Sequence, residues 1–182
     1  MSIFKVVNYK HDDLNHLQDR LTYIRRIEAT RRRFTYGVAL SESNPFSSMN
    51  MVKEAYHQTN GKTHFHYILS PEKEDLENLL LDEFMEVSIE VASLIGHFGG
   101  DFQVVSTIHL DSSIPHIHII ANNIDYKTGL RFSLSKWILN DLKETINFIL
   151  SKYGISKILG YEIVDGDEED LRSIMENYSW KK

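Results

Sequence analysis

The chain has 182 residues, of which 20 are Lys or Arg, 26 are Asp or Glu and none is Cys, and its formal net charge is -6. With 42% hydrophobic residues it is too apolar for a disordered chain, and no apolar run reaches the ~20 residues that span a bilayer. The absence of Cys excludes disulfides and thiolate metal sites, so a metal ion would have to be held by His, Asp or Glu.

The length and the amino terminus indicate one cytoplasmic domain. At roughly 100–200 residues per domain, residues 1–182 suit a single domain with one core. Residues 1–8 lack the long apolar segment and the small-residue cleavage site of a signal peptide. We therefore expect a single cytoplasmic domain that ends in an acidic tail over about residues 162–182.

The net charge conceals an uneven distribution. Residues 1–35 contain eight basic and four acidic side chains, whereas residues 162–182 contain three basic and seven acidic ones. A second acidic stretch covers residues 72–90, and such runs usually form solvated faces. The negative total disfavours nucleic acid as a partner, but the basic amino-terminal region keeps that partner open.

Hydrophobic periodicity, capping residues and turn residues predict alternating strands and helices. In chain order we expect a strand at 3–9, a helix at 12–28, a strand at 34–39, a helix at 48–59, a strand at 63–69, a long helix at 72–98, strands at 102–109, 115–122 and 131–134, and a helix at 135–153. Asp12 or Asp13 would cap the first helix and Ser135 the last. Because 102–122 reads as a tight hairpin, we predict an α+β fold with helices packed on a mainly antiparallel sheet.

Three of the nine histidines lie in the predicted hairpin. His116 and His118 point to one face, because side chains alternate along a strand. If the hairpin turns at Ser112 and Ser113, His109 lies opposite His116 with Cβ atoms about 4.5–5.5 Å apart. Three imidazoles on one face can hold a divalent metal ion and leave coordination positions open. The alternative is a set of ordinary half-buried histidines, which the third His in cross-strand register disfavours.

One tyrosine lies outside the apolar stripe of the first predicted helix. At 100° per residue, Tyr23 falls on the polar side, between His16 and Arg26, while the stripe is formed by Leu14, Leu17, Leu21, Ile24 and Ile27. Tyr23 is either a partly exposed residue packed on a neighbouring strand or a nucleophile. A phenolate can attack phosphorus once a metal ion has drawn charge from the phosphate.

An arginine cluster follows this tyrosine, with Phe34 and Tyr36 beside it. It consists of Arg25, Arg26, Arg31, Arg32 and Arg33. Guanidinium groups pair with phosphates and aromatic rings stack on bases, so the cluster fits a nucleic-acid strand. Alternatively, some of these arginines pair with Glu28 or with the acidic helix.

These features together resemble a known family. The run from His109 to Asn122, HLDSSIPHIHIIAN, resembles the H-x-D-x-x-x-P-H-x-H-x-x-x-N motif of conjugative relaxases, the MobA/MobL-type mobilization nucleases of the HUH endonuclease superfamily. Upstream, residues 21–24 (LTYI) resemble the segment that carries the family's catalytic tyrosine. Residues 66–70 (HYILS) resemble the strand motif before the long helix. The resemblance covers roughly residues 3–155.

The resemblance implies a metal-dependent enzyme that nicks and rejoins single-stranded DNA at the transfer origin of a plasmid or integrative element. The three histidines would hold a divalent ion, Mn²⁺ or Mg²⁺. Tyr23 would attack the phosphorus and stay joined to the DNA 5′ end, and Asp111 would orient a histidine or assist as a base. Asn122, Ser70 and His66 would support this site or contact DNA.

The same resemblance implies particular partners and a cellular setting. We expect a monomer in the bacterial cytoplasm, encoded by a mobile element and without membrane contact. Its partners would be single-stranded DNA at the transfer origin, with a hairpin, and accessory relaxosome and coupling proteins.

Four alternatives remain open from the residues alone. A rolling-circle replication initiator or a single-tyrosine transposase would place its tyrosine after the histidines, which leaves Tyr126 and Tyr153 as second choices. A histidine-triad nucleotide hydrolase would need His where Ile120 stands. The last alternative is a non-catalytic DNA-binding module with a structural metal ion.

Overall fold

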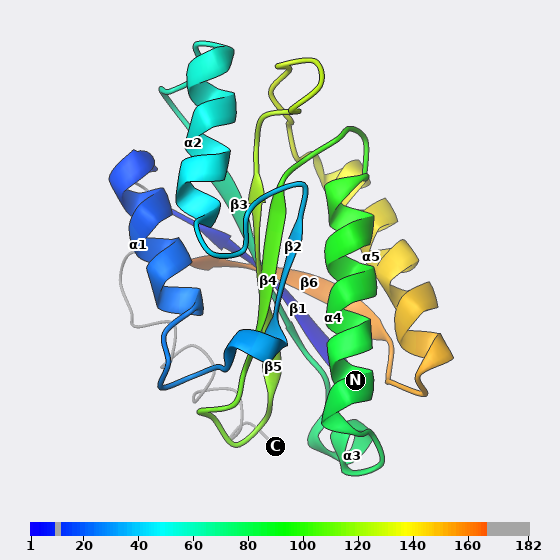
Figure 1. Cartoon of the computed structure of the whole chain (residues 1–182). Coiled ribbons are helices and arrows are strands. Elements are labelled where there is room, and N and C mark those ends of the chain that lie inside the picture. The colour runs from blue at the N-terminus through cyan, green and yellow to red at the C-terminus, as the bar shows by residue number, and fades with distance from the viewer. Residues whose placement is uncertain (10–11, 167–182) are drawn as a thin grey trace.

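Six strands and the helices on both sides of them make up the described part of the chain, residues 1–9 and 12–166 of a computed structural model (Figure 1). The elements are β1 (Ser2–Asn8), α1 (Leu14–Ile24), the 3₁₀ turn η1 (Arg32–Phe34), β2 (Thr35–Val38), α2 (Pro45–Ala55), β3 (His64–Ser70), α3 (Lys73–Glu77), α4 (Leu81–Gly96), β4 (Val104–His109), β5 (His116–Asn122), α5 (Lys136–Lys152) and β6 (Ile158–Asp165).

The strands form one sheet in the order β2-β4-β5-β3-β1-β6. The pairs β2–β4, β4–β5, β5–β3 and β3–β1 are antiparallel, and β6 lies parallel to β1 at the edge. The predicted α+β fold with a mainly antiparallel sheet is therefore confirmed.

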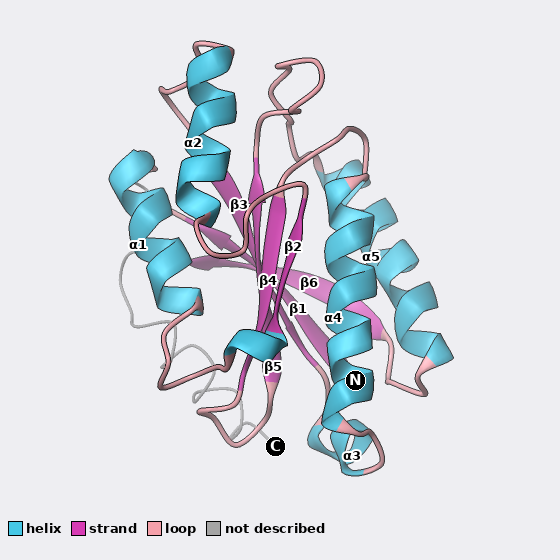
Figure 2. Ribbon diagram, in the orientation of Figure 1, coloured by secondary structure: helices cyan, strands magenta, loops and turns pink. Residues whose placement is uncertain are grey.

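The two faces of the sheet differ in what covers them (Figure 2). Helices α4 and α5 cover one face over a large apolar core that includes Phe84, Val91 and Ile146. Helices α1 and α2 cover the other face, where a smaller cluster joins Leu17, Leu21, Ile24 and Met49 to Val105 and Ile120 of the sheet. The smaller core leaves room under α1 for polar side chains.

The strand register gathers histidines under α1. His109 pairs with His116, as the hairpin arithmetic predicted, and His118 pairs with Thr107 on one side and Ile68 on the other. Directly opposed residues share a face, and so do residues two apart along a strand. Five buried histidines therefore share this face: His64, His66, His109, His116 and His118.

The first helix begins as predicted and ends early. The Asp13 side chain accepts a hydrogen bond from the His16 backbone N–H at 2.9 Å. The helix ends at Ile24 rather than Glu28, because the backbone turns at Arg26, whose carbonyl accepts from Thr30 at 3.2 Å. Ile27 consequently lies beyond the helix and is 75% exposed, so its predicted place in the apolar stripe was wrong.

The predicted helix over 72–98 is two helices, α3 and α4. Leu80 between them has an extended backbone, and its N–H donates to the Glu83 side chain at 2.8 Å, which starts a new helix. Helix α2 begins at Pro45 instead of residue 48, because Asn44 caps it and proline suits the first turn.

Towards the carboxyl end, one predicted strand is absent from the described structure and one observed strand was not predicted. Residues 131–134 form only an isolated bridge between Arg131 and Ile124, whereas β6 was not predicted. Residues 162–165 of the predicted acidic tail belong to β6, and residues 167–182 lie outside the described residues. Among the described helices, none has the length and apolar character needed to cross a membrane.

Candidate metal centre and nucleophile

Three histidines converge where β4 ends and β5 begins. The ring centroids of His109 and His118 are 4.2 Å apart. The ring centroid of His116 lies 5.4 Å from that of His109 and 5.0 Å from that of His118. One ring nitrogen from each lies within 4.8 Å of the other two. The predicted three-histidine cluster is confirmed as a group that could hold a metal ion.

Hydrogen bonds to backbone carbonyls identify which nitrogen is available in two of the three rings, His109 and His116. His109 Nε2–H donates to the Ile24 carbonyl at 2.8 Å, and its buried Nδ1 has no hydrogen-bond partner in the described chain. His116 Nδ1–H donates to the Ile114 carbonyl at 3.1 Å, which leaves its Nε2 free of a proton. That Nε2 lies 3.2 Å from His118 Nε2. Two nitrogens bound to one ion at ~2.1 Å lie about 3.0–3.4 Å apart, so this donor set fits a divalent metal.

The protonation states also suit a metal ion. Burial lowers the pKa of His109 to about 4 and lowers the pKa of His116 and His118 as well. The three rings are therefore neutral at pH 7, as metal ligands must be.

Tyr23 lies beside this centre. Its ring centroid is 5.7 Å from that of His109 and 5.8 Å from that of His118. The last turn of α1 holds it there, because the neighbouring Ile24 is fully buried against the sheet. Tyr23 is half-buried, so one side of the ring faces the histidines.

Arg26 connects Tyr23 to Asp111. The guanidinium carbon lies 4.0 Å from the Tyr23 ring centroid, and Nη2 donates to Asp111 Oδ2 at 2.7 Å. Burial opposes the charge on Arg26, but its interactions with Tyr23 and Asp111 outweigh this effect and raise its pKa. Burial would raise the pKa of Asp111, yet the pairing with Arg26 lowers it. Asp111 Oδ1 is 4.0 Å from His109 Nδ1, too far for a hydrogen bond.

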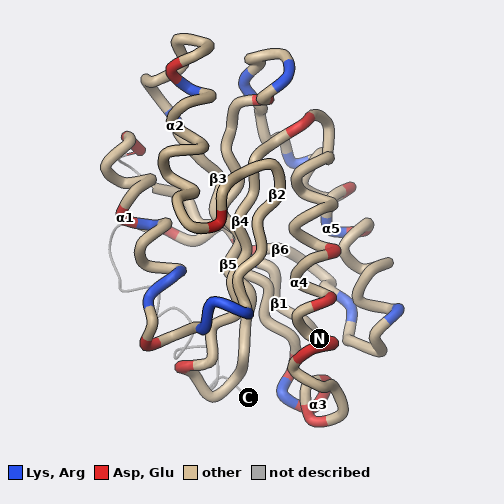
Figure 3. The backbone as a smooth tube through the Cα atoms, viewed as in Figure 1, with Lys and Arg blue, Asp and Glu red and all other residues tan. Residues whose placement is uncertain are grey.

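The other predicted arginines follow α1 or belong to η1, where basic residues gather along the chain (Figure 3). Arg31, Arg32 and Arg33 are exposed and Arg25 is half-buried. Arg31 donates to the backbone carbonyls of Ile27 and Thr30, and Arg33 lies over the Phe34 ring. A surface hollow of about 320 Å³ opens here. It is lined by Arg25, Ile27, Thr30, Arg31, Arg32, Thr35, Glu42 and Ser43.

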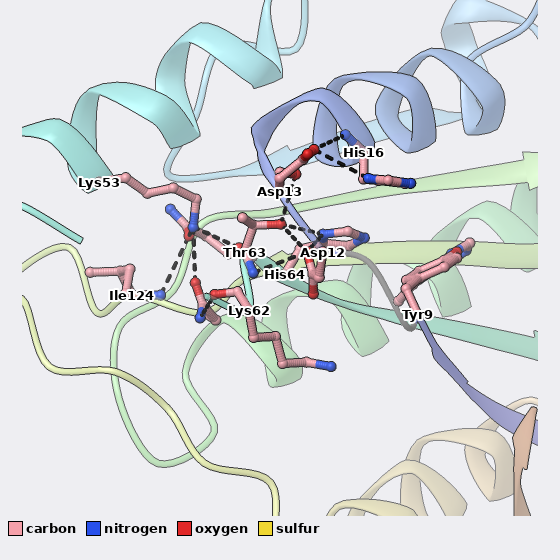
Figure 4. A network of polar contacts seen from close by, with 12 residues as sticks. Tyr9, Asp12, Asp13, His16, Lys53, Lys62, Thr63, His64 and Ile124 are labelled. Carbon is pink, nitrogen blue, oxygen red and sulfur yellow. Dashed lines mark hydrogen bonds and ion pairs between the residues drawn. The ribbon is translucent and has the colours of Figure 1, made fainter. Parts of the chain in front are cut away.

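Asn122 contacts α2. It is 1% exposed, its Oδ1 accepts from Lys53 Nζ at 2.6 Å, and its Nδ2 donates to Gln103 at 3.0 Å. Lys53 Nζ also donates to the Thr63 carbonyl and to Asn123 Oδ1 (Figure 4). Sequence reasoning missed Lys53, because a lysine within a predicted helix gives no sign of burial.

A second network on β3 also escaped sequence reasoning. Asp12 Oδ1 accepts from the Thr63 N–H at 3.1 Å and lies 3.2 Å from His64 Nδ1 (Figure 4). His66, two residues along, is fully buried and lies within hydrogen-bonding distance of His118. Ser70 is the last residue of β3, which ends beside the start of β5. It is buried and pairs with Ile3 of β1.

The two tyrosines kept as second choices lie elsewhere. Tyr153 packs on the opposite face of the sheet, where its hydroxyl donates to Glu90 at 2.8 Å. Tyr126 follows the end of β5 that is remote from His116. Of these candidates, Tyr23 is the one whose ring contacts the three-histidine cluster.

The class of protein is given by a comparison with protein families. The model of the relaxase family, MobA/VirD2-like, nuclease domain, matches residues 23–155. The chain therefore belongs to this relaxase family. The prediction of a relaxase is confirmed.

Solved structures give the same result for the fold. The MobM relaxase domain (MOBV; Mob_Pre), Mn-bound and in complex with plasmid pMV158 oriT DNA of 22 nucleotides with a 3′-thiophosphate, superposes with a TM-score of 0.65 at 12% identity, covering 99% of each chain. Its Mn-bound complex with 23 nucleotides gives a TM-score of 0.63 at 14% identity, again covering 99% of each chain. A search among curated proteins finds no similar sequence.

Proposed function

We propose that this relaxase nicks and rejoins one DNA strand at the transfer origin of a plasmid or integrative element, with Tyr23 as the nucleophile. The observation that carries the proposal is the contact between the Tyr23 ring and two of the three candidate metal ligands. Membership of the relaxase family supports the reaction, and the oriT DNA in the MobM complexes supports the substrate.

The metal ion would be held by His109 Nδ1 and His116 Nε2, which the hydrogen bonds to backbone carbonyls leave without protons, and by His118 Nε2, which lies 3.2 Å from His116 Nε2. The Mn-bound MobM complexes support Mn²⁺, and Mg²⁺ is the alternative. When bound, the ion supplies positive charge that polarises the scissile phosphate.

Tyr23 would form a bond from its hydroxyl oxygen to phosphorus as the bond from phosphorus to the 3′-oxygen breaks. The phenol loses its proton and the 3′-oxygen gains one, so the products are a 5′-phosphotyrosine and a 3′-hydroxyl. One phosphodiester bond replaces another, and the step can therefore run backwards to rejoin the ends. Arg26, 4.0 Å from the ring centroid, would stabilise the negative oxygen as the proton leaves.

Asp111 would position Arg26 rather than act as a base. Its pairing with Arg26 lowers its pKa, and a carboxylate with a lowered pKa accepts protons weakly. The arginine cluster around η1 would bind the DNA backbone. Phe34 is 2% exposed within the larger apolar core and Tyr36 packs against that core, so the expected stacking of Phe34 on a base does not fit the structure. His66 would act through His118, whereas Asn122 would fix α2. Ser70, which is 3% exposed, would support the site rather than contact DNA.

Further parts of the proposal concern partners and setting. The net charge of -6 predicts weak non-specific attraction to DNA, so a hairpin at the transfer origin would provide much of the recognition. A single domain acting as a cytoplasmic monomer, with accessory relaxosome and coupling proteins, completes the proposal.

The test is a denaturing gel after incubation with single-stranded DNA and Mn²⁺. Labelled oligonucleotides tile both strands of the mobile element that encodes the chain. We expect one oligonucleotide to give a covalent protein–DNA adduct that needs the metal ion and is lost in His116→Ala. The matched control is His97→Ala, because the His97 side chain is 60% exposed and pairs with Asp101. Nicking without an adduct, or normal adduct formation by His116→Ala, would contradict the proposal.

A further inference from the structure

The three candidate ligands differ in what holds the nitrogen that faces away from the centre. For His109 that partner is the backbone carbonyl of Ile24. His116 Nδ1 lies 3.1 Å from the Ile114 carbonyl and 3.1 Å from Ser112 Oγ, whose hydroxyl donates to the same carbonyl. For His118 the partner is another side chain: its Nδ1 lies 2.9 Å from His66 Nε2. His66 Nδ1 in turn lies 2.6 Å from the Tyr9 hydroxyl.

This difference matters because a carbonyl oxygen can only accept a hydrogen bond. It therefore forces the proton onto the facing nitrogen and leaves the other nitrogen free for a metal ion. A neutral imidazole can either donate or accept, and so can the Tyr9 hydroxyl behind it. These hydrogen bonds therefore hold His118 in either tautomer, and they would support the one with the proton on Nδ1 when an ion is bound at Nε2. Tyr9 is the group in contact with the far side of His66.

The geometry points to His66 and Tyr9 as positioning residues for the metal ion, acting through His118. In this arrangement the Tyr9 oxygen accepts from His66 Nδ1–H, and His66 Nε2 accepts from His118 Nδ1–H. His118 Nε2 then keeps its lone pair for the ion. The inference rests on the metal site of the proposed function and adds the two residues that support one ligand in its competent form through hydrogen bonds.

The hydrogen bonds that join Tyr9, His66 and His118 allow two arrangements of their protons. His66 is 0% and His118 1% exposed, and each nitrogen of His66 has one hydrogen-bonding neighbour, His118 Nδ1 on one side and the Tyr9 hydroxyl on the other. In the reverse arrangement His118 would carry its proton on Nε2, which lies 3.2 Å from His116 Nε2 and would be lost as a ligand.

Tyr9 is itself held by the helix that carries the proposed nucleophile. It is 6% exposed, and the Arg20 guanidinium carbon of α1 lies 4.8 Å from its ring centroid. Tyr23 on the same helix contacts the His118 ring. Docking of α1 thus places both the proposed nucleophile and the group that orients His66.

Two substitutions at one position separate the two contacts of His66. In His66→Gln the terminal amide takes the place of Nε2, and its oxygen can still accept from His118. In His66→Asn the shorter amide takes the place of Nδ1, beside Tyr9, and the contact with His118 is lost. His64→Gln is the matched control, because His64 lies on the same strand and face and its described contacts are with Thr63, Asp12 and Tyr9.

The readout is Mn²⁺ affinity of the whole chain without DNA, from the electron paramagnetic resonance signal of free Mn²⁺. Loss of a partner behind a ligand histidine weakens metal binding roughly 10–100-fold, and we expect this loss in His66→Asn. His66→Gln and His64→Gln should bind Mn²⁺ within about threefold of the parent chain. His66→Gln keeps an acceptor for His118, and His64→Gln changes a residue that has no described contact with His118. In ¹⁵N spectra with Zn²⁺ bound, the His118 proton should be on Nδ1.

Three results would overturn the inference. They are unchanged Mn²⁺ affinity in a folded His66→Asn, equal weakening in His64→Gln, or a His118 proton on Nε2. His116→Ala separates this failure from that of the proposed function. If it too binds Mn²⁺ normally, the metal site itself is wrong; if it loses Mn²⁺ while His66→Asn does not, only the role of His66 falls.

Discussion

Arg26 contacts two groups of the proposed active site at once. Its guanidinium lies over the Tyr23 ring and pairs with Asp111, so the charge is fixed in place rather than exposed on a mobile stem. The sequence indicated a DNA contact for this residue, as for the other arginines of the cluster. The structure instead places it at the proposed nucleophile.

We predict that Arg26→Lys slows adduct formation about tenfold or more at saturating DNA. Lysine keeps the charge but loses the planar group that stacks on the ring and pairs with the carboxylate, a loss of about 1–2 kcal/mol. The measurement is the single-turnover rate of adduct formation. Arg31→Lys is the control, since Arg31 bonds only to backbone carbonyls of Ile27 and Thr30 among its described contacts, and should weaken DNA affinity with little change in this rate. Equal rate losses in both variants would contradict the assignment.

The residues that could be predicted from the sequence are those brought together within one hairpin. Alternation along a strand and the hairpin register suffice to bring His109, His116 and His118 together, and both were readable from spacing. The contacts from Tyr9 through His66 to His118 were not, because Tyr9 directly follows β1 whereas the histidines lie on β3 and β5, and the three meet only through the order of strands in the sheet. The role of Arg26 depends on the backbone turn after Ile24, which no spacing rule indicated.

Among the elements, α2 is fixed to the sheet by a buried lysine. Lys53 is 0% exposed, and its ammonium donates to three carbonyl oxygens at the ends of β3 and β5. Burial, with a smaller effect of the Arg131 charge, lowers the pKa of Lys53 to about 7.

We predict that Lys53→Met lowers the free energy of unfolding by about 2–4 kcal/mol, because it leaves buried oxygens of Thr63, Asn122 and Asn123 without their donor. Urea denaturation measures the change. Lys136→Met, at an exposed position of α5, should change stability by less than about 0.5 kcal/mol. A Lys53→Met variant as stable as the parent chain would show that these bonds do not hold α2.

The helices and strands that were predicted wrongly depend on contacts between distant parts of the chain. Leu76, Leu79 and Leu80 fall within about 100° of one another on a continuous helix, so periodicity alone joins α3 to α4. The break depends on the backbone at Leu80. The strand β6 has exposed Leu159 and Ile163 and two acidic residues, which is a poor strand signal. Its pairing is a parallel alignment with the distant β1.

For the whole molecule, the buried histidine face predicts sensitivity to acid. The pKa of His109 in the folded chain, about 4, lies below its value of roughly 6.5 in an unfolded chain. Between these values the unfolded state binds more protons, so stability is complete above pH 6.5 and is lost as pH falls towards 4. The other four buried histidines act in the same direction, since burial lowers the pKa of each.

We expect the metal-free protein to lose about 2 kcal/mol of unfolding free energy between pH 7 and pH 5 from His109 alone. Urea titrations at each pH measure the slope. A stability that stays constant over this range would mean that the histidines are protonated in the folded state, and would remove the basis for neutral ligands.

The charge distribution along the chain explains how a protein with a negative net charge can act on DNA. The net charge of -6 is a sum over a basic region at the end of α1 and η1 and acidic segments such as α3 and the start of α4 (Figure 3). Composition alone argued against nucleic acid. The distribution places positive charge beside the proposed nucleophile instead.

The most direct test of the account is to identify the residue that carries the DNA. Trypsin cuts after Arg20 and Arg25, so it releases Tyr23 in the peptide of residues 21–25. Mass spectrometry of the digested adduct should find nucleotide on Tyr23 in this peptide, and Tyr23→Phe should form no adduct. Nucleotide on Tyr126, Tyr153 or a histidine, or an undiminished adduct in Tyr23→Phe, would contradict the central claim.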